Sequence, residues 1–129
     1  MAHSRILLIE DSPTYSKLAR LLLSASGHEV TCAATAEDGL RIARESVPDL
    51  ILLDINLPDS DGFTAVKRLR EDPRSQGIVT IGLTADRIWG EEERQEARSA
   101  GFDEYFEKPF TEAAFRSLIA PFVGAGEEP

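Results

Sequence analysis

The 129-residue sequence predicts a doubly wound α/β fold, in which helices cover both faces of one parallel β-sheet. First, short apolar runs alternate five times with longer helix-like segments, and no linker or change of composition interrupts the alternation. Second, the central run Leu50–Leu53 is branched aliphatic throughout, too short for a helix and without polar alternation, which indicates a strand buried on both faces. Third, the connections are short, as they are between the units of such a sheet.

Local signals place the individual helices. Ser12 and Pro13 supply an N-cap and a first-turn proline for a helix that Gly27 ends, and Thr35 caps the next helix. We expect strands at residues 5–9, 30–33, 50–53, 78–83 and 101–109, and later helices at 62–70, 91–100 and from 111 through Phe122 and Val123. The helix at 91–100 is rich in charge and poor in apolar residues, so it should pack weakly. Residues 1–123 would form one domain and residues 124–129 a flexible tail.

Composition excludes several classes of protein. The formal charge of -9, from 23 acidic and 14 basic residues, disfavours direct binding of nucleic acid and favours a protein partner. No apolar run is long enough to span a membrane, and the N-terminus lacks the apolar core of a signal peptide, so we expect a cytoplasmic protein. Neither His3 nor His28 has the spacing of a zinc ligand, and Cys32 is expected to be a buried core thiol.

Polar residues follow the apolar strands at the ends where chemistry is done in α/β sheets. Glu10 and Asp11 follow the first strand, Asp54 ends the third, Thr84 ends the fourth, and Lys108 follows the fifth. Because parallel strands end at one edge, these groups should converge. Crowded carboxylates without histidine or thiolate suit Mg²⁺, and a lysine can pair with an acid or a phosphate. The set therefore indicates a phosphoryl-transfer clamp.

Each of these residues also has a plainer interpretation when it is considered alone. Asp54 could merely cap the following turn, Thr84 could be a strand-end hydroxyl, and Lys108 could be a surface cation. Tyr105, three residues before Lys108, is a further candidate, and it could be an ordinary core aromatic. Their combination, at successive strand ends, favours the functional interpretation.

The chain resembles the receiver domain of two-component response regulators, chemotaxis regulators among them. The resemblance runs from Ile6 to about Val123 and depends on Glu10-Asp11, on the stretch from Asp54 to Gly62 with Pro58, on Thr84-Ala85 and on Lys108-Pro109, in that order. It implies a flavodoxin-like (βα)5 fold with strand order 2-1-3-4-5. The sequence pattern by itself gives no strand order.

The resemblance also implies roles for the site residues. Asp54 would accept a phosphoryl group from a histidine kinase or histidine phosphotransfer protein. Asp11 would bind Mg²⁺ directly and Glu10 through water, with Asp54 and the backbone carbonyl of Asn56 as further ligands and Mn²⁺ as an acceptable substitute. Thr84 and the Ala85 amide would hold the phosphoryl oxygens, and Lys108 would pair with them.

A switch in partner binding completes the implied function. Tyr105 would turn inward as Thr84 moves toward phosphate, reshaping the face formed by the fourth helix, fifth strand and fifth helix for a downstream protein effector. The segment 86–90 is slightly longer than is typical. Ile88 and Trp89 either face a partner, which we favour, or form a local hydrophobic staple for the fourth helix. Polar Asn56 and Asp86 favour a short-lived phosphorylated state, lost by autodephosphorylation.

Two alternatives differ in class. An aspartate-nucleophile phosphatase would need a second acid two residues after the nucleophile, where this chain has Asn56. A receiver-like scaffold that binds partners without phosphorylation would not need the complete set of acids and lysine. We expect a phosphoacceptor domain rather than an enzyme that acts on another substrate.

Overall fold

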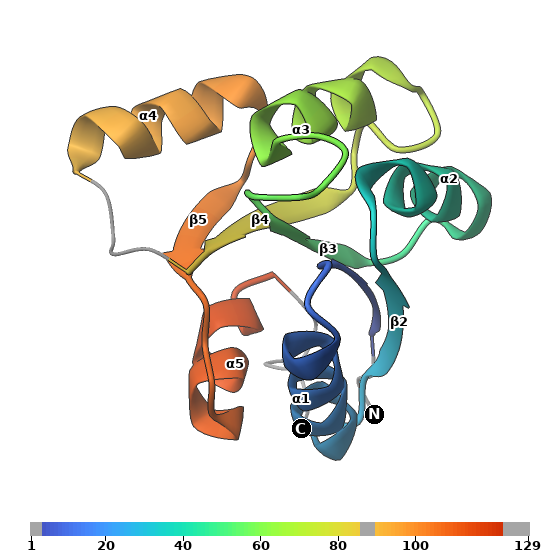
Figure 1. Cartoon of the computed structure of the whole chain (residues 1–129), viewed down its shortest axis with the longest axis vertical. Helices are drawn as coiled ribbons and strands as arrows, with labels where there is room; N and C mark the ends of the chain where they lie inside the picture. The colour runs from blue at the N-terminus through green and yellow to red at the C-terminus, as the bar shows by residue number, and fades with distance from the viewer. Residues whose placement is uncertain (1–3, 86–89, 123–129) are drawn as a thin grey trace.

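The sheet is fully parallel and has the order β2-β1-β3-β4-β5, as the resemblance implied (Figure 1). A computed structural model describes residues 4–85 and 90–122 of the chain. Its strands are β1 (Arg5–Ile9), β2 (Glu29–Ala33), β3 (Leu50–Asp54), β4 (Val79–Thr84) and β5 (Glu104–Glu107). Its helices are α1 (Pro13–Ala25), α2 (Ala36–Ser46), α3 (Gly62–Glu71), α4 (Glu91–Ala100) and α5 (Glu112–Ile119).

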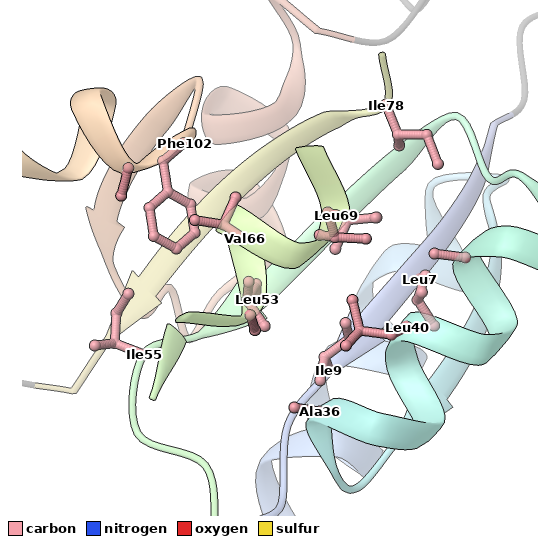
Figure 2. Close-up of a cluster of buried hydrophobic side chains, with 14 of the residues drawn as sticks. Leu7, Ile9, Ala36, Leu40, Leu53, Ile55, Val66, Leu69, Ile78 and Phe102 are labelled. Atoms are coloured by element: carbon pink, nitrogen blue, oxygen red, sulfur yellow. The ribbon is translucent and has the colours of Figure 1, made fainter. Parts of the chain in front are cut away.

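Helices lie on both faces of the sheet, and each face has its own core. α2, α3 and α4 cover one face, where their apolar side chains pack against alternate residues of β1 and β3 (Figures 1 and 2). α1 and α5 cover the other, where Phe115 and Leu23 pack against Leu8 and Leu52. Every residue of β3 is buried, so the prediction of a central strand buried on both faces is confirmed.

Side-chain caps begin α1, α2, α3 and α5 close to where the sequence predicted these helices. The hydroxyl of Ser12 accepts a hydrogen bond from the Tyr15 amide, and that of Thr35 accepts one from the Asp38 amide. Asp61 and Thr111 cap α3 and α5 in the same way. These caps fix where each helix begins after its strand, and therefore where the loops above the strand ends run.

Two predicted boundaries differ from the structure. β5 is shorter than residues 101–109, because Gly101 has a φ of 128° and serves as the C-cap of α4. α5 ends at Ile119 rather than running through Phe122, because Pro121 has no N–H to donate to a helical carbonyl. Val123 lies outside the described residues.

α4 has the predicted bounds and buries only Ala97 and Ala100, as expected of a weakly packed helix. Its N-cap is Gly90, which has no side chain to accept a hydrogen bond from the first turn. Ile88 and Trp89, which we expected to face a partner, lie outside the described residues, and so does Asp86, which we expected to influence the lifetime of the phosphorylated state. Within the ranges 4–85 and 90–122, no helix is long and apolar enough to cross a membrane.

Candidate functional site

Three carboxylates meet at the edge of the sheet where the parallel strands end. Glu10 and Asp11 follow β1, Asp54 ends β3, and one oxygen from each lies within 4.8 Å of the others. Glu10 and Asp54 are buried, whereas Asp11 is exposed. The predicted convergence of these acids is therefore present in the structure.

Backbone hydrogen bonds hold the two buried carboxylates in place. The Asn56 amide donates to Oδ1 of Asp54 at 3.1 Å, and the Ser12 amide donates to Oε2 of Glu10 at 2.9 Å. The amide of Glu10 itself donates to the carbonyl of Ala33 at the end of β2. Both acids thus depend on main-chain positions and not only on their own rotamers.

Lys108 supplies the cation of the group. Its amide donates to the carbonyl of Thr84, which holds the loop after β5 against the end of β4. Its Nζ lies 2.7 Å from Oε1 of Glu10 and 3.6 Å from Oδ2 of Asp54, and 4.8 Å from the centre of the Tyr15 ring. We expected Lys108 to pair with Asp54 or a phosphate, whereas its shorter contact is with Glu10.

The electrostatic balance leaves the site negative. Among the described residues, the ion pairs that reach the three carboxylates come from Lys108 alone, so two negative charges remain uncompensated. Burial is the largest cause that raises the pKa of Asp54 from 3.8 to about 6, and the charges of Glu10 and Asp11 raise it further. The Asn56 amide and Lys108 act in the opposite direction. Such a pocket favours a cation.

The other residues predicted for the site, Thr84, Ala85 and Asn56, differ in how far they are exposed to solvent. Thr84 is buried at the end of β4, and Ala85 follows it on the surface. Ala85 and Lys108 line a groove of about 390 Å³ that extends along α1. The side chain of Asn56 is exposed, so its backbone is the part that touches Asp54.

Tyr105 faces the core beneath α3 and α4, not the acidic pocket. Only 4% of the residue is exposed, and its ring lies 6.3 Å from that of Phe102. A Cβ on Gly82, directly across the β4–β5 ladder, would lie 2.8 Å from Cδ1 of Tyr105. The absence of a side chain at Gly82 therefore gives the Tyr105 ring room to lie inward.

Sequence reasoning missed two residues near the site. Tyr15 lies on α1, and its hydroxyl donates to the carbonyl of Pro109 at 2.8 Å, which ties α1 to the loop that carries Lys108. Burial, then the charges of Glu10 and Asp54, raise the pKa of Tyr15, so it stays neutral. Asp59 caps α2 from the loop after β3. The sequence could have pointed to Tyr15, because it lies in the first turn of the helix that Ser12 caps, next to Glu10 and Asp11. No sequence signal pointed to Asp59 as a cap of α2.

A second, larger groove lies between β5 and α5. It has a volume of about 750 Å³, and its lining includes Phe106, Pro109, Ala114 and Leu118. Phe110, which also lines this groove, is 61% exposed. β5 is the edge strand of the sheet: among the described strands it pairs only with β4, so its other edge has no strand partner.

Known proteins are similar to this chain in sequence and in fold. The family model of the response regulator receiver domain matches residues 6–120. The polar-differentiation response regulator DivK of Brucella ovis is 36% identical over 119 residues, which cover 92% of this chain and 95% of that protein.

Solved structures agree with this match. The receiver domain of a sensor histidine kinase from Pseudomonas aeruginosa, solved with a magnesium ion in its active site cleft, is 31% identical. The alignment has a TM-score of 0.83 and covers 96% of this chain and all of that one. The chemotaxis response regulator CheY4 of Vibrio cholerae is 25% identical with a TM-score of 0.85, covering 93% and 98% of the two chains. The chain therefore belongs to the response regulator receiver domain family.

Proposed function

We propose that this receiver domain accepts a phosphoryl group on Asp54 in a Mg²⁺-dependent reaction and thereby switches its binding to a protein partner. The observation that carries the proposal is the convergence of Glu10, Asp11 and Asp54 within 4.8 Å, with Lys108 beside them. Crowded acids at strand ends cost stability unless they serve a cation and a substrate, so a purely structural role does not account for them.

The residues of the pocket fit Mg²⁺. The donors are carboxylate oxygens, the ligand type that Mg²⁺ prefers, and two of their negative charges are uncompensated. Asp11 and Asp54 would bind the ion directly, Glu10 through water, and the Asn56 carbonyl would complete the protein ligands. Mn²⁺, which accepts the same oxygen donors, would substitute. When bound, the ion would neutralise the charge on the transferring phosphoryl oxygens.

The residues of the chain perform the transfer itself. An ionised oxygen of Asp54 attacks the phosphorus of a phosphohistidine in the kinase or phosphotransfer protein. The new bond is P–O, the bond that breaks is P–N, and the histidine nitrogen leaves with the electron pair. Lys108 pairs with the phosphoryl oxygens, while the Thr84 hydroxyl and the Ala85 amide donate hydrogen bonds to them.

The switch would connect Asp54 to the face made by α4, β5 and α5. Thr84 ends the strand that pairs with β5, and Tyr105 packs against that strand at Gly82. Movement of Thr84 toward the phosphoryl group would change the room available to the Tyr105 ring. Since Tyr105 already lies inward, phosphorylation would fix this orientation rather than create it.

The downstream effector would be a protein that docks on this face. α4 is held by two small buried residues, so it can shift at low cost, and the groove between β5 and α5 offers apolar surface. The charge of -9 disfavours nucleic acid as the direct partner. We also propose that the phosphorylated state is short-lived, because exposed Asn56 can orient an attacking water.

The decisive experiment is incubation with acetyl phosphate and Mg²⁺, followed by intact mass spectrometry. We expect the wild-type protein to gain one phosphoryl group, Asp54→Asn to gain none, and Asp49→Asn to behave as wild type. Asp49 is the matched control because it is an exposed carboxylate immediately before the opposite end of the same strand. Chelation of the metal should abolish the reaction.

Other outcomes would favour the alternatives. Steady release of phosphate from small phosphate esters would indicate the phosphatase, and no reaction in the wild-type protein would indicate the scaffold. Equal labelling of wild type and Asp54→Asn would contradict Asp54 as the acceptor. A phosphorylated form that persisted for many hours with Mg²⁺ would contradict the short lifetime.

A further inference from the structure

The loop after β3 is fastened to a helix that is distant in sequence. The carboxylate of Asp59 accepts hydrogen bonds from the amides of Ala36 and Glu37, at 2.9 and 3.1 Å. The next amide of α2, that of Asp38, is taken by the Thr35 hydroxyl. A residue 23 positions beyond Ala36 therefore caps the first turn of α2, where a negative charge is favourable.

The rest of this loop is held mainly at its two ends. The Ile55 amide donates to the carbonyl of Leu83, the Gly62 amide donates to the carbonyl of Ile55, and Asn56 pairs with Asp61. Between these ends, Asp59 is the residue whose hydrogen bonds reach another element of the described structure. The Ala36 bond, as the largest cause, holds the pKa of Asp59 below its usual value, so the carboxylate stays charged at neutral pH.

The bond to α2 closes a ring of contacts around the acidic pocket. The carbonyl of Ala33, three residues before Ala36, accepts the amide of Glu10. Glu10 contacts Lys108, which in turn reaches Asp54. The backbone then runs from Asp54 through the loop to Asp59. The two sides of the pocket are therefore joined through the start of α2 as well as through the ion pairs.

We infer that Asp59 is a positioning residue for the acidic pocket: its carboxylate ties the loop 55–61 to the first turn of α2 and so fixes where Asn56 lies relative to Glu10 and Asp54. The expected effect of Asp59 on metal binding rests on the proposed function, since Asn56 is a proposed ligand. The expected effect of Asp59 on the position of the loop rests only on the contacts described above. Asp59 would act through the loop and would not itself bind the metal or the substrate.

Two variants and a matched control test the inference. Asp59→Ala removes both acceptors, whereas Asp59→Asn keeps one carbonyl oxygen for the Ala36 amide. Asp38→Ala is the control, because Asp38 is an exposed carboxylate in the same turn of α2 whose side chain pairs only outward with Arg41 among the described contacts. It removes the same charge and leaves the loop fastened.

The first measurement is the dissociation constant for Mg²⁺ alone, by isothermal titration calorimetry. Residues that orient metal ligands typically change affinity by about 10-fold or more, so we expect about 10-fold weaker binding for Asp59→Ala. Asp59→Asn should recover part of the loss, and Asp38→Ala should stay within about 2-fold of wild type. Equal affinities for Asp59→Ala and Asp38→Ala would overturn the inference, even if Asp59→Ala lowered the melting temperature.

The second measurement is hydrogen exchange in the metal-free protein, which does not depend on the proposed function. Asp59→Ala should speed exchange at the amides of Asn56 and Gly62, whereas Asp38→Ala should not. Unchanged exchange at these amides would overturn the inference about the loop. If wild type bound no Mg²⁺, the proposed function would fail, and the exchange data alone would decide the positioning role.

Discussion

Asp54→Asn should stabilise the metal-free protein, because the residue proposed to do the chemistry is unfavourable for folding. Burial is the main cause that raises the pKa of Asp54 from 3.8 to about 6. Since one pKa unit corresponds to about 1.4 kcal/mol, keeping this carboxylate ionised costs about 3 kcal/mol at neutral pH. Asparagine carries no charge, and its carbonyl oxygen can still accept the Asn56 amide. The gain should therefore approach about 3 kcal/mol, less the cost of burying the amide.

The sign of the pH dependence follows from the same pKa. Below pH 3.8 the carboxyl is protonated in both the folded and unfolded states, so the penalty is absent; it grows as the pH rises toward 6 and is constant above that. The advantage of Asp54→Asn should thus be about 3 kcal/mol near pH 7.5 and about 1 kcal/mol near pH 4.5. Urea unfolding with a chelator at both pH values measures it.

Mg²⁺ and a surface control complete this test. Millimolar Mg²⁺ should stabilise wild type more than the variant and so reduce the difference between them. Asp38→Asn, at an exposed carboxylate, should change stability by less than about 0.5 kcal/mol. The burial penalty assigned to ionised Asp54 would be wrong if Asp54→Asn were no more stable than wild type near pH 7.5, or if its advantage were the same near pH 4.5.

Three further substitutions probe the site and its support. Lys108→Met should lower metal-free stability by about 3 kcal/mol or more, because it leaves buried Glu10 without its ion pair, as urea unfolding would measure. Gly62→Ala should cost about 1–3 kcal/mol and weaken Mg²⁺ binding, because a Cβ there would lie 2.8 Å from Cα of Ile55, next to the acceptor. Val47→Asn should raise stability by about 1 kcal/mol, because Val47 has a φ of 46° that asparagine tolerates better, and the melting temperature would report it.

Each of these substitutions has a control or a contrary result. Lys67→Met, at an exposed lysine on α3, should leave stability nearly unchanged, and an equal loss for both lysine variants would count against the buried ion pair. Gly77→Ala places a Cβ where nothing lies within 4 Å, so it should be tolerated. If Val47→Asn gave no gain, the left-handed backbone at that position would carry no strain.

The parts of the fold that follow from adjacent residues could be predicted from the sequence. The apolar run before Asp54 specified a strand buried on both faces, and the hydroxyls of Ser12 and Thr35 specified where α1 and α2 begin. These signals work because a strand or a cap is decided by residues within a few positions of each other. The order of the strands has no such local signal, and it came from the resemblance to a family.

The two boundaries that the sequence pattern placed wrongly, those of β5 and α5, are set mainly by a capping glycine and by a proline. The apolar and aromatic residues from Gly101 to Phe106 are typical of a strand, but Gly101 caps α4, and Phe102 packs against Phe63 of α3 before the strand begins. The apolar pattern continues past Ile119, but the helical ladder stops there. The Ala120 amide still donates to the carbonyl of Arg116, whereas Pro121 has no N–H to donate and the Phe122 amide reaches back only to the carbonyl of Ile119. Hydrophobic periodicity marks which residues are buried and does not by itself mark where an element ends.

The pairing within the site could not be predicted, and it bears on the chemistry. Sequence position brings Lys108 near both acids, but the choice between them depends on which carboxylate is more deeply enclosed. The side chain of Glu10 is 1% exposed, so it has the greater need of a close cation, and Lys108 lies 2.7 Å from it against 3.6 Å from Asp54. Asp54 is therefore left with the weaker ion pair, which only partly offsets the rise in its pKa caused mainly by burial, while Glu10 holds the lysine beside it. If Asp54 is the phosphoryl acceptor, as we propose, its attack on phosphorus would not first require a tight ion pair at Asp54 to be broken.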